Sequence, residues 1–133
     1  MEGKGAEIMP YNPDFDVDLK FGEKFEGCLA DILNRVKVEV KTERDLWADT
    51  GNIAVEIRCN SRPSGLSVTK ADYWAHIMTK GDEIKFIVIL PVTTLKRRVK
   101  HLLKTNQANI ISGGENNASE LILIPLSKVI GNK

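Results

Sequence analysis

Three of the carboxylates between residues 37 and 57 could act together with one lysine of the same stretch, KVEVKTERDLWADTGNIAVEI. Glu39 and Lys41 are two residues apart, and Asp45 and Glu56 follow them. Carboxylates bind hard divalent cations such as Mg²⁺, which keep several of their waters. A bound cation can activate a water for attack on a phosphodiester, and a nearby ammonium can neutralise the charge that develops. These residue types therefore suit a phosphodiester-cleaving site that uses Mg²⁺ or Mn²⁺.

Two strands are predicted to carry Glu39, Lys41 and Glu56, because apolar and polar side chains alternate over residues 36–43 and 52–59, and Asp45 lies between the strands. If the two strands form an antiparallel hairpin centred between Trp47 and Ala48, Glu39 lies opposite Glu56. Like charges in that position repel each other unless a cation lies between them. A hairpin with one solvated face is the competing interpretation, and it explains the alternation without a metal.

The other elements follow from hydrophobic periodicity and turn residues. Residues 1–18 are predicted to form an extended arm, and residues 19–133 a single domain. Within the domain we expect a helix over 21–34, a strand from about residue 73, a central strand covered on both faces in IKFIVILPV, a helix over 94–104, a polar loop over 106–119 and a final strand with a terminal turn over 120–130. The order α-β-β-β-β-α-β indicates an α/β protein of the mixed-sheet α+β kind, with helices flanking the central sheet.

Composition limits the possible classes of function. The 133 residues carry a net charge of +1, so a nucleic-acid partner would have to meet a local basic cluster and not a general positive field. Two cysteines make no disulfide framework. No signal peptide is visible, and the longest apolar run is far too short to span a bilayer. We therefore expect a cytoplasmic protein with no membrane partner.

A local basic cluster is present in TLKRRVKHLLK, where the cations are Lys96, Arg97, Arg98, Lys100 and Lys104. Such a helix can neutralise DNA phosphates, although a basic helix face is also common as plain solvated surface. Upstream, the loop SRPSGLSVTK offers Ser64 and Lys70 as further phosphate contacts, with a simple connecting loop as the alternative.

The chain resembles the PD-(D/E)XK nuclease superfamily, and in particular its small phage-encoded endonucleases. The resemblance rests on a helix with a glutamate, then VEVK, TGNIAVEI, RPSGLSVTKADYWAHIM and ISGGENNASELILIPLSKVI. It implies a restriction-endonuclease-like core in which acids on adjacent strands bind Mg²⁺ and a helix glutamate completes the site. Glu26 matches that glutamate, with Glu23 as the alternative.

The superfamily motif can be aligned in two ways. In the first, Glu39-Val40-Lys41 is the E-x-K and Asp45 and Glu56 are its partner acids. In the second, which we prefer, Asp45 is the lone acid and Glu56-Ile57-Arg58 the second motif, while Lys41 supplies the ammonium and Glu39 is a third acid. The chain departs from the family because no PD precedes EVK.

The resemblance implies a metal-dependent DNA endonuclease, with branched or junction DNA as one substrate and a homodimer as the assembly. A phage-encoded enzyme of this kind works in the cytoplasm of the host cell. The alternative is a catalytically silent nucleic-acid- or protein-binding module on the same fold, such as a phage accessory protein.

Overall fold

The computed structural model describes residues 13–131, the side chains of residues 13–18 excepted. The chain divides into two compact units, Met1–Arg35 and Val36–Lys133. The described part of the first unit contains the helix α1 (Pro13–Asn34). It begins eight residues before the predicted start, so the extended arm is wrong for residues 13–18, and residues 1–12 lie outside the described part. Proline suits the first turn of a helix because its φ is preset and no N–H partner is needed there.

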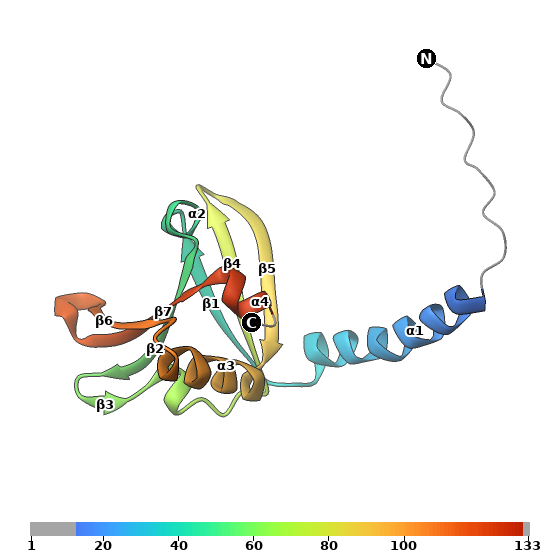
Figure 1. Ribbon diagram of the computed structural model, residues 1–133, viewed down its shortest axis with the longest axis horizontal. Coiled ribbons are helices and arrows are strands. Elements are labelled where there is room, and N and C mark those ends of the chain that lie inside the picture. The colour runs from blue at the N-terminus through green and yellow to red at the C-terminus, as the bar shows by residue number, and fades with distance from the viewer. Residues whose placement is uncertain (1–12, 132–133) are drawn as a thin grey trace, which may run out of the picture. The chain divides into compact units, whose positions relative to one another are not determined.

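The second unit is an α+β domain built from two sheets (Figure 1). Its elements in chain order are β1 (Val38–Arg44), α2 (Leu46–Thr50), β2 (Asn52–Cys59), β3 (Arg62–Pro63), the 3₁₀ turn η1 (Gly65–Ser67), β4 (Tyr73–Lys80), β5 (Glu83–Pro91), α3 (Val92–Lys104), β6 (Asn109–Gly113), the 3₁₀ turn η2 (Glu115–Asn117), β7 (Ser119–Pro125) and α4 (Leu126–Ile130). The mixed α+β class is as predicted.

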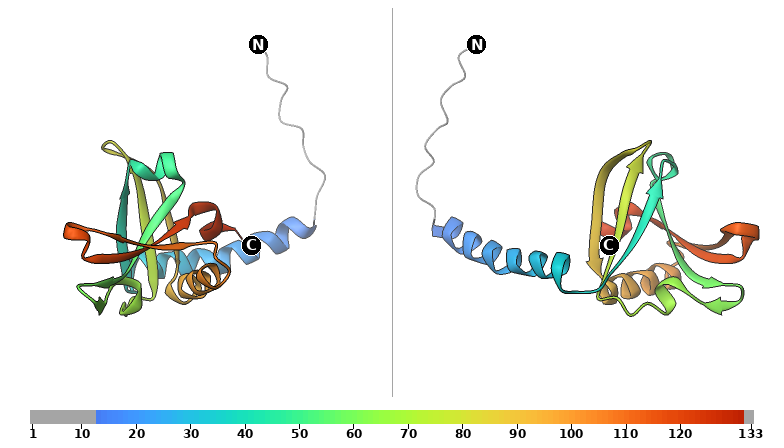
Figure 2. Two further views of the ribbon diagram at one scale, coloured as in Figure 1. Left: turned by 60° about the vertical axis from the view of Figure 1, so that its left-hand side comes forward. Right: turned by 180° about the vertical axis from the view of Figure 1, so that it is seen from behind.

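Sheet A has the strand order β1-β4-β5, and its three strands are seen side by side in Figure 2. β1 and β4 are parallel, whereas β4 and β5 are antiparallel. Sheet B has the order β3-β2-β7-β6 and is antiparallel throughout. Between the two sheets the side chains of β2 and β7 meet those of β4 and of α3, the helix that Figure 1 shows in orange.

The predicted β1–β2 hairpin is wrong, because the two strands belong to different sheets. β1 pairs with β4, which places Glu39 beside Trp74, whereas β2 pairs with β7, which places Glu56 beside Leu121. The predicted turn between the strands is the short helix α2, which ends at Gly51 with a φ of 72°. Alternation correctly separated the side chains of each strand into two faces, but it carries no information about the neighbouring strand. On β1 the charged face lies on the side of the buried Trp74 and His76, whereas Val40 of the apolar face is exposed.

The predicted central position of the apolar run 84–92 is also wrong. β5 is an edge strand, and four of its large apolar side chains are exposed: Ile84, Phe86, Ile87 and Ile89. β4 occupies the centre instead, and its Trp74, His76 and Met78 are fully buried. A continuous apolar run suits a strand with both faces covered, but it does not say how many strands lie beside it.

The predicted loop over 106–119 contains β6, which pairs with β7 as a hairpin. Its turn is built from Gly114, Asn116 and Asn117, all with positive φ. Asparagine and glycine adopt this conformation at low cost, so the polar residues that indicated a loop form a tight connection between strands.

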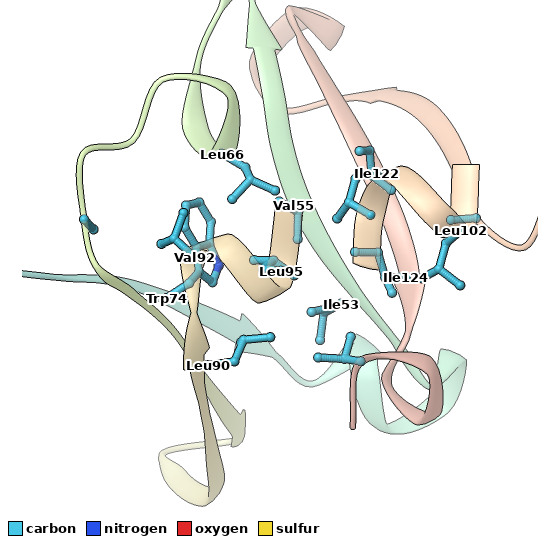
Figure 3. Close-up of a cluster of buried hydrophobic side chains, with 14 of the residues drawn as sticks. Ile53, Val55, Leu66, Trp74, Leu90, Val92, Leu95, Leu102, Ile122 and Ile124 are labelled. Carbon is cyan, nitrogen blue, oxygen red and sulfur yellow. The ribbon is translucent and has the colours of Figure 1, made fainter. Parts of the chain in front are cut away.

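The core lies between sheet B, β4 and α3 (Figure 3). Ile53 and Val55 of β2 meet Ile122 and Ile124 of β7, while Leu95 and Leu102 of α3 and the Trp74 ring close the cluster. Each of these strands and the helix contributes one apolar face to the same interior, which explains their hydrophobic patterns.

Candidate functional site

Glu39 and Lys41 form an ion pair on β1, with Oε1 and Nζ 3.2 Å apart. They lie on the same side of sheet A as the buried residues Trp74 and His76, which are their register partners. The Lys41 ammonium is also 5.7 Å from the centre of the Trp74 ring. Both side chains of the pair are about 40% exposed (40% and 41%), so the pair contributes little to stability but can be reached by a ligand.

Asp45 has a structural partner in its own sheet. Its Oδ1 accepts a 2.7 Å hydrogen bond from the N–H of Gly81, in the turn between β4 and β5. Its backbone N–H donates to the carbonyl of Thr79 at 3.1 Å, and its φ of 29° is unusual for a residue other than glycine. Asp45 therefore joins the end of β1 to the β4–β5 turn.

Glu56 lies in sheet B, where its Oε1 accepts a 2.6 Å hydrogen bond from the hydroxyl of Ser119. An ion pair of 3.0 Å joins the neighbouring Arg58 to Glu120 on β7. Glu56 therefore does not lie opposite Glu39. Residues 13–131, side chains before 19 excepted, contain no group of three acidic, histidine or cysteine side chains placed to hold one metal ion.

The other predicted residues are scattered. Glu26 is exposed on α1, in the first unit. Ser64 precedes η1, and its hydroxyl is buried with no hydrogen-bond partner among the described residues. Lys70 is exposed on the loop before β4. Lys70 makes no ion pair with Glu39 among the side chains of residues 19–131.

A buried polar cluster was not predicted. Trp74 Nε1 donates a 2.8 Å hydrogen bond to Nε2 of His76, a fully buried side chain. The His76 Nδ1 lies 3.2 Å from Oε1 of Glu43, but it is not aligned for a hydrogen bond. The same Oε1 accepts a 2.9 Å hydrogen bond from the N–H of Ala54, so Glu43 links the two sheets. In the sequence, the alternation already placed Glu43 on the same face of the strand as Glu39 and Lys41, and this was the one indication that Glu43 could belong to a polar cluster.

Five of the six basic residues of α3 gather on one face. A turn of 3.6 residues places Lys96, Arg97, Lys100, His101 and Lys104 within an arc of about 140°, opposite the buried Leu95, Val99 and Leu102. We call these five side chains the basic face of α3. All five are exposed, and the helix contains no acidic residue.

The charges of this basic face are not neutralised within the described chain. None of its four lysines and arginines makes a salt bridge there. Arg98 lies off the face and donates a 2.6 Å hydrogen bond to the carbonyl of Gly131. A hollow of about 310 Å³ lies alongside, lined by Thr94, Arg97, Arg98 and His101. Four donor-bearing side chains around an open hollow can contact the oxygens of a phosphate.

Within residues 13–131 we find no helix that combines the length and the apolar character needed to cross a membrane. Comparison with protein-family models, with curated proteins and with solved structures found no match to this chain. The resemblance to the PD-(D/E)XK superfamily therefore stays a prediction from the sequence, and the side chains described above are the basis for a proposed function.

Proposed function

We propose that the domain binds nucleic acid through the basic face of α3. The observation that carries this proposal is the set of unneutralised cations on one helical arc of a chain whose net charge is only +1. Cations that lack a carboxylate neighbour can exchange their water and counterions for phosphates, which is the main source of affinity for nucleic acids. Four of the five predicted DNA contacts on this helix belong to the basic face: Lys96, Arg97, Lys100 and Lys104.

Binding should depend steeply on salt. If the four lysines and arginines each neutralise one phosphate, log K falls with log[salt] with a slope of about −3 to −4. The measurement is fluorescence anisotropy of a labelled DNA duplex over a range of KCl concentrations. A slope near zero, or no binding at low salt, would contradict the proposal.

Charge-matched variants test whether α3 is the surface involved. Arg97→Gln, Lys100→Gln and Lys104→Gln together should lower affinity at low salt at least tenfold and flatten the slope to about −1. The control is Arg62→Gln, Lys80→Gln and Lys85→Gln, which removes the same charge from strands outside α3. Equal losses in the two triple variants would show a general charge effect and reject the α3 surface.

The second candidate is the metal-dependent DNA endonuclease that the resemblance implies. The Glu39–Lys41 ion pair favours it, because it sets a carboxylate and an ammonium 3.2 Å apart on an accessible strand face. Mg²⁺ needs only one or two carboxylates when waters and substrate phosphates complete its shell. Glu39 would hold Mg²⁺ or Mn²⁺, which would activate a water, and Lys41 would stabilise negative charge on the phosphate. Asp45, Glu56 and Glu26 fit less well, because the first two have other partners and Glu26 belongs to the first unit.

Cleavage assays separate the two candidates. Plasmid and four-way junction DNA are incubated with Mg²⁺ or Mn²⁺ and either the wild-type chain, Glu39→Gln or Lys41→Ala. The nuclease proposal expects both substitutions to reduce cleavage about a hundredfold or more, whereas Glu56→Gln has little effect. If the wild-type chain binds DNA but cuts neither substrate, the nuclease proposal is rejected and the nucleic-acid-binding proposal is kept.

A further inference from the structure

An open hollow of about 460 Å³ lies on the other side of α3, between the helix, η1 and sheet B. Its walls are aliphatic: Ile57, Leu66, Val99, Leu103 and Ile122. Figure 3 shows Leu66 and Ile122 close to Val55 at the edge of the buried cluster. The volume falls within the range of pockets that take small ligands.

The walls are held in place before any ligand arrives. Leu66, Val99 and Ile122 are 3%, 7% and 1% exposed, so their positions are fixed by the core. The hydroxyl of Ser67, at the rim, donates a 2.7 Å hydrogen bond to the carbonyl of Ile57, which attaches η1 to β2. A Cβ on Gly65 would overlap the carbonyl of Glu56, so only glycine allows this approach. A preformed pocket loses less entropy on binding than one that must be ordered.

Two cations border these apolar walls. Lys96 and Lys100, one helical turn apart, line the hollow, and neither makes a salt bridge with a side chain of residues 19–131. Among the described residues no aromatic ring lines the hollow, so it offers no platform on which a nucleobase could stack. Aliphatic walls beside two ammonium groups match an alkyl chain that ends in an anion.

We propose that this hollow binds a free alkyl carboxylate, with its chain on the aliphatic walls and its carboxylate between the ammonium groups of Lys96 and Lys100. The proposal does not depend on nucleic-acid binding or on nuclease activity, since it uses the walls of the hollow as well as the two lysines.

The test is isothermal titration calorimetry of the full chain with hexanoate, octanoate and decanoate at low salt. Each pair of added methylenes should tighten binding several-fold, up to about tenfold, because the chain contacts apolar walls. Decyltrimethylammonium, which has the same chain and the opposite charge, should bind at least tenfold more weakly than decanoate. Equal affinity for the two decyl compounds, or no dependence on chain length, would overturn the proposal.

Variants locate the site. Lys96→Gln with Lys100→Gln should weaken decanoate binding about tenfold, whereas Arg97→Gln with Lys104→Gln removes the same charge from the same helix and should change it less than twofold. Leu103→Gln places a polar side chain on the wall and should reduce the gain per methylene, with a thermal melt to check that the variant is folded. Equal losses in the two double variants would place the ligand elsewhere.

Other occupants give distinct results. In methyl NMR spectra decanoate should shift the signals of Leu103 and Ile122, which both line the hollow. A single-stranded oligonucleotide or an acidic peptide that shifts these methyls while decanoate does not would assign the hollow to that partner and reject the alkyl carboxylate.

Discussion

At the scale of single residues, two glutamates four positions apart on β1 have different roles. Glu39 is solvent-accessible and pairs with Lys41, whereas the Glu43 carboxylate accepts the Ala54 N–H and lies beside the buried His76. The first is suited to chemistry and the second to holding the sheets together. A carboxylate that satisfies a partly buried N–H is costly to remove, because the donor then loses that partner.

Stability measurements can separate these two roles. Glu43→Ala should lower the free energy of unfolding by about 2–3 kcal/mol, since it removes the carboxylate that accepts the Ala54 N–H. Glu39→Ala, on the same strand and the same face, should change it by less than ~0.5 kcal/mol. Urea titration followed by circular dichroism gives both values. Similar losses for the two variants would reject the structural role of Glu43.

Two glycines with positive φ allow a second comparison at this scale. Gly65 has a φ of +51° and no room for a Cβ, whereas Gly81 has a φ of +58° and no heavy atom within 4 Å of the point where a Cβ would lie. Gly81→Ala should lower the free energy of unfolding by only about 1–2 kcal/mol, because a residue with a side chain adopts this left-handed backbone conformation less readily. Gly65→Ala should cost more than ~3 kcal/mol, because η1 must move away from β2. The same urea titration measures both variants. Equal losses of unfolding free energy would show that η1 can move away from β2 without cost.

At the scale of elements, the two surfaces of α3 share Lys96 and Lys100. A DNA duplex on the basic face and an alkyl carboxylate in the hollow would therefore compete. Decanoate at saturating concentration should weaken DNA binding about three- to tenfold at low salt, because up to two phosphate contacts are lost. Anisotropy titrations with and without decanoate measure this. Sodium acetate at the same concentration is the control for ionic strength, and an equal effect of acetate would exclude direct competition.

Several elements were predictable from the sequence because their signals are local. β2 (Asn52–Cys59) begins and ends where alternation does, β4 begins at Tyr73 as expected, and α3 begins two residues before its predicted start. The spacing of Glu39 and Lys41 also placed both on one face, as observed. Each of these features depends only on residues within one strand or helix.

The predictions that were wrong concern the pairing of strands that lie far apart in the sequence. The partner of β1 is β4 and the long partner of β2 is β7, both distant in sequence, so alternation could not reveal that Glu39 and Glu56 belong to different sheets. The Glu43–His76 contact depends on the parallel register of β1 with β4, which no local pattern encodes. The assignment of Asp45 and Glu56 to one metal stays a prediction from the sequence, and in the structure each carboxylate has a hydrogen-bond partner of its own, the Gly81 N–H and the Ser119 hydroxyl.

At the scale of the whole molecule, sheet A has an apolar outer side. Val40, Ile87 and Ile89 are 52%, 50% and 36% exposed, and they lie on the side away from Trp74 and His76. Edge strands with exposed apolar side chains often pair or pack with another chain. This surface is therefore a candidate interface for the predicted homodimer, and substitutions on it can test whether the dimer forms.

A single charge introduced at this surface should weaken self-association of the chain. Analytical ultracentrifugation over a wide concentration range should detect dimers of the wild-type chain, and Ile87→Lys should shift them to monomer without loss of thermal stability. Lys85→Ile, on the same strand, adds an apolar residue in place of a charge and should strengthen association. A wild-type chain that is monomeric throughout would reject the homodimer.

The pairing of β2 with β7 sets an order of events during synthesis. Glu56 and Ser119 are 63 residues apart, and β2 has its full-length partner only when residues 119–125 have been made. Until then the Ile53 and Val55 side chains lack the β7 strand beside them, and contacts of such long range form slowly. We expect chains that end at Ala118 to remain sensitive to protease and to bind chaperones. The domain should therefore complete its fold only after translation has passed β7, because sheet B lacks its second full-length strand until then.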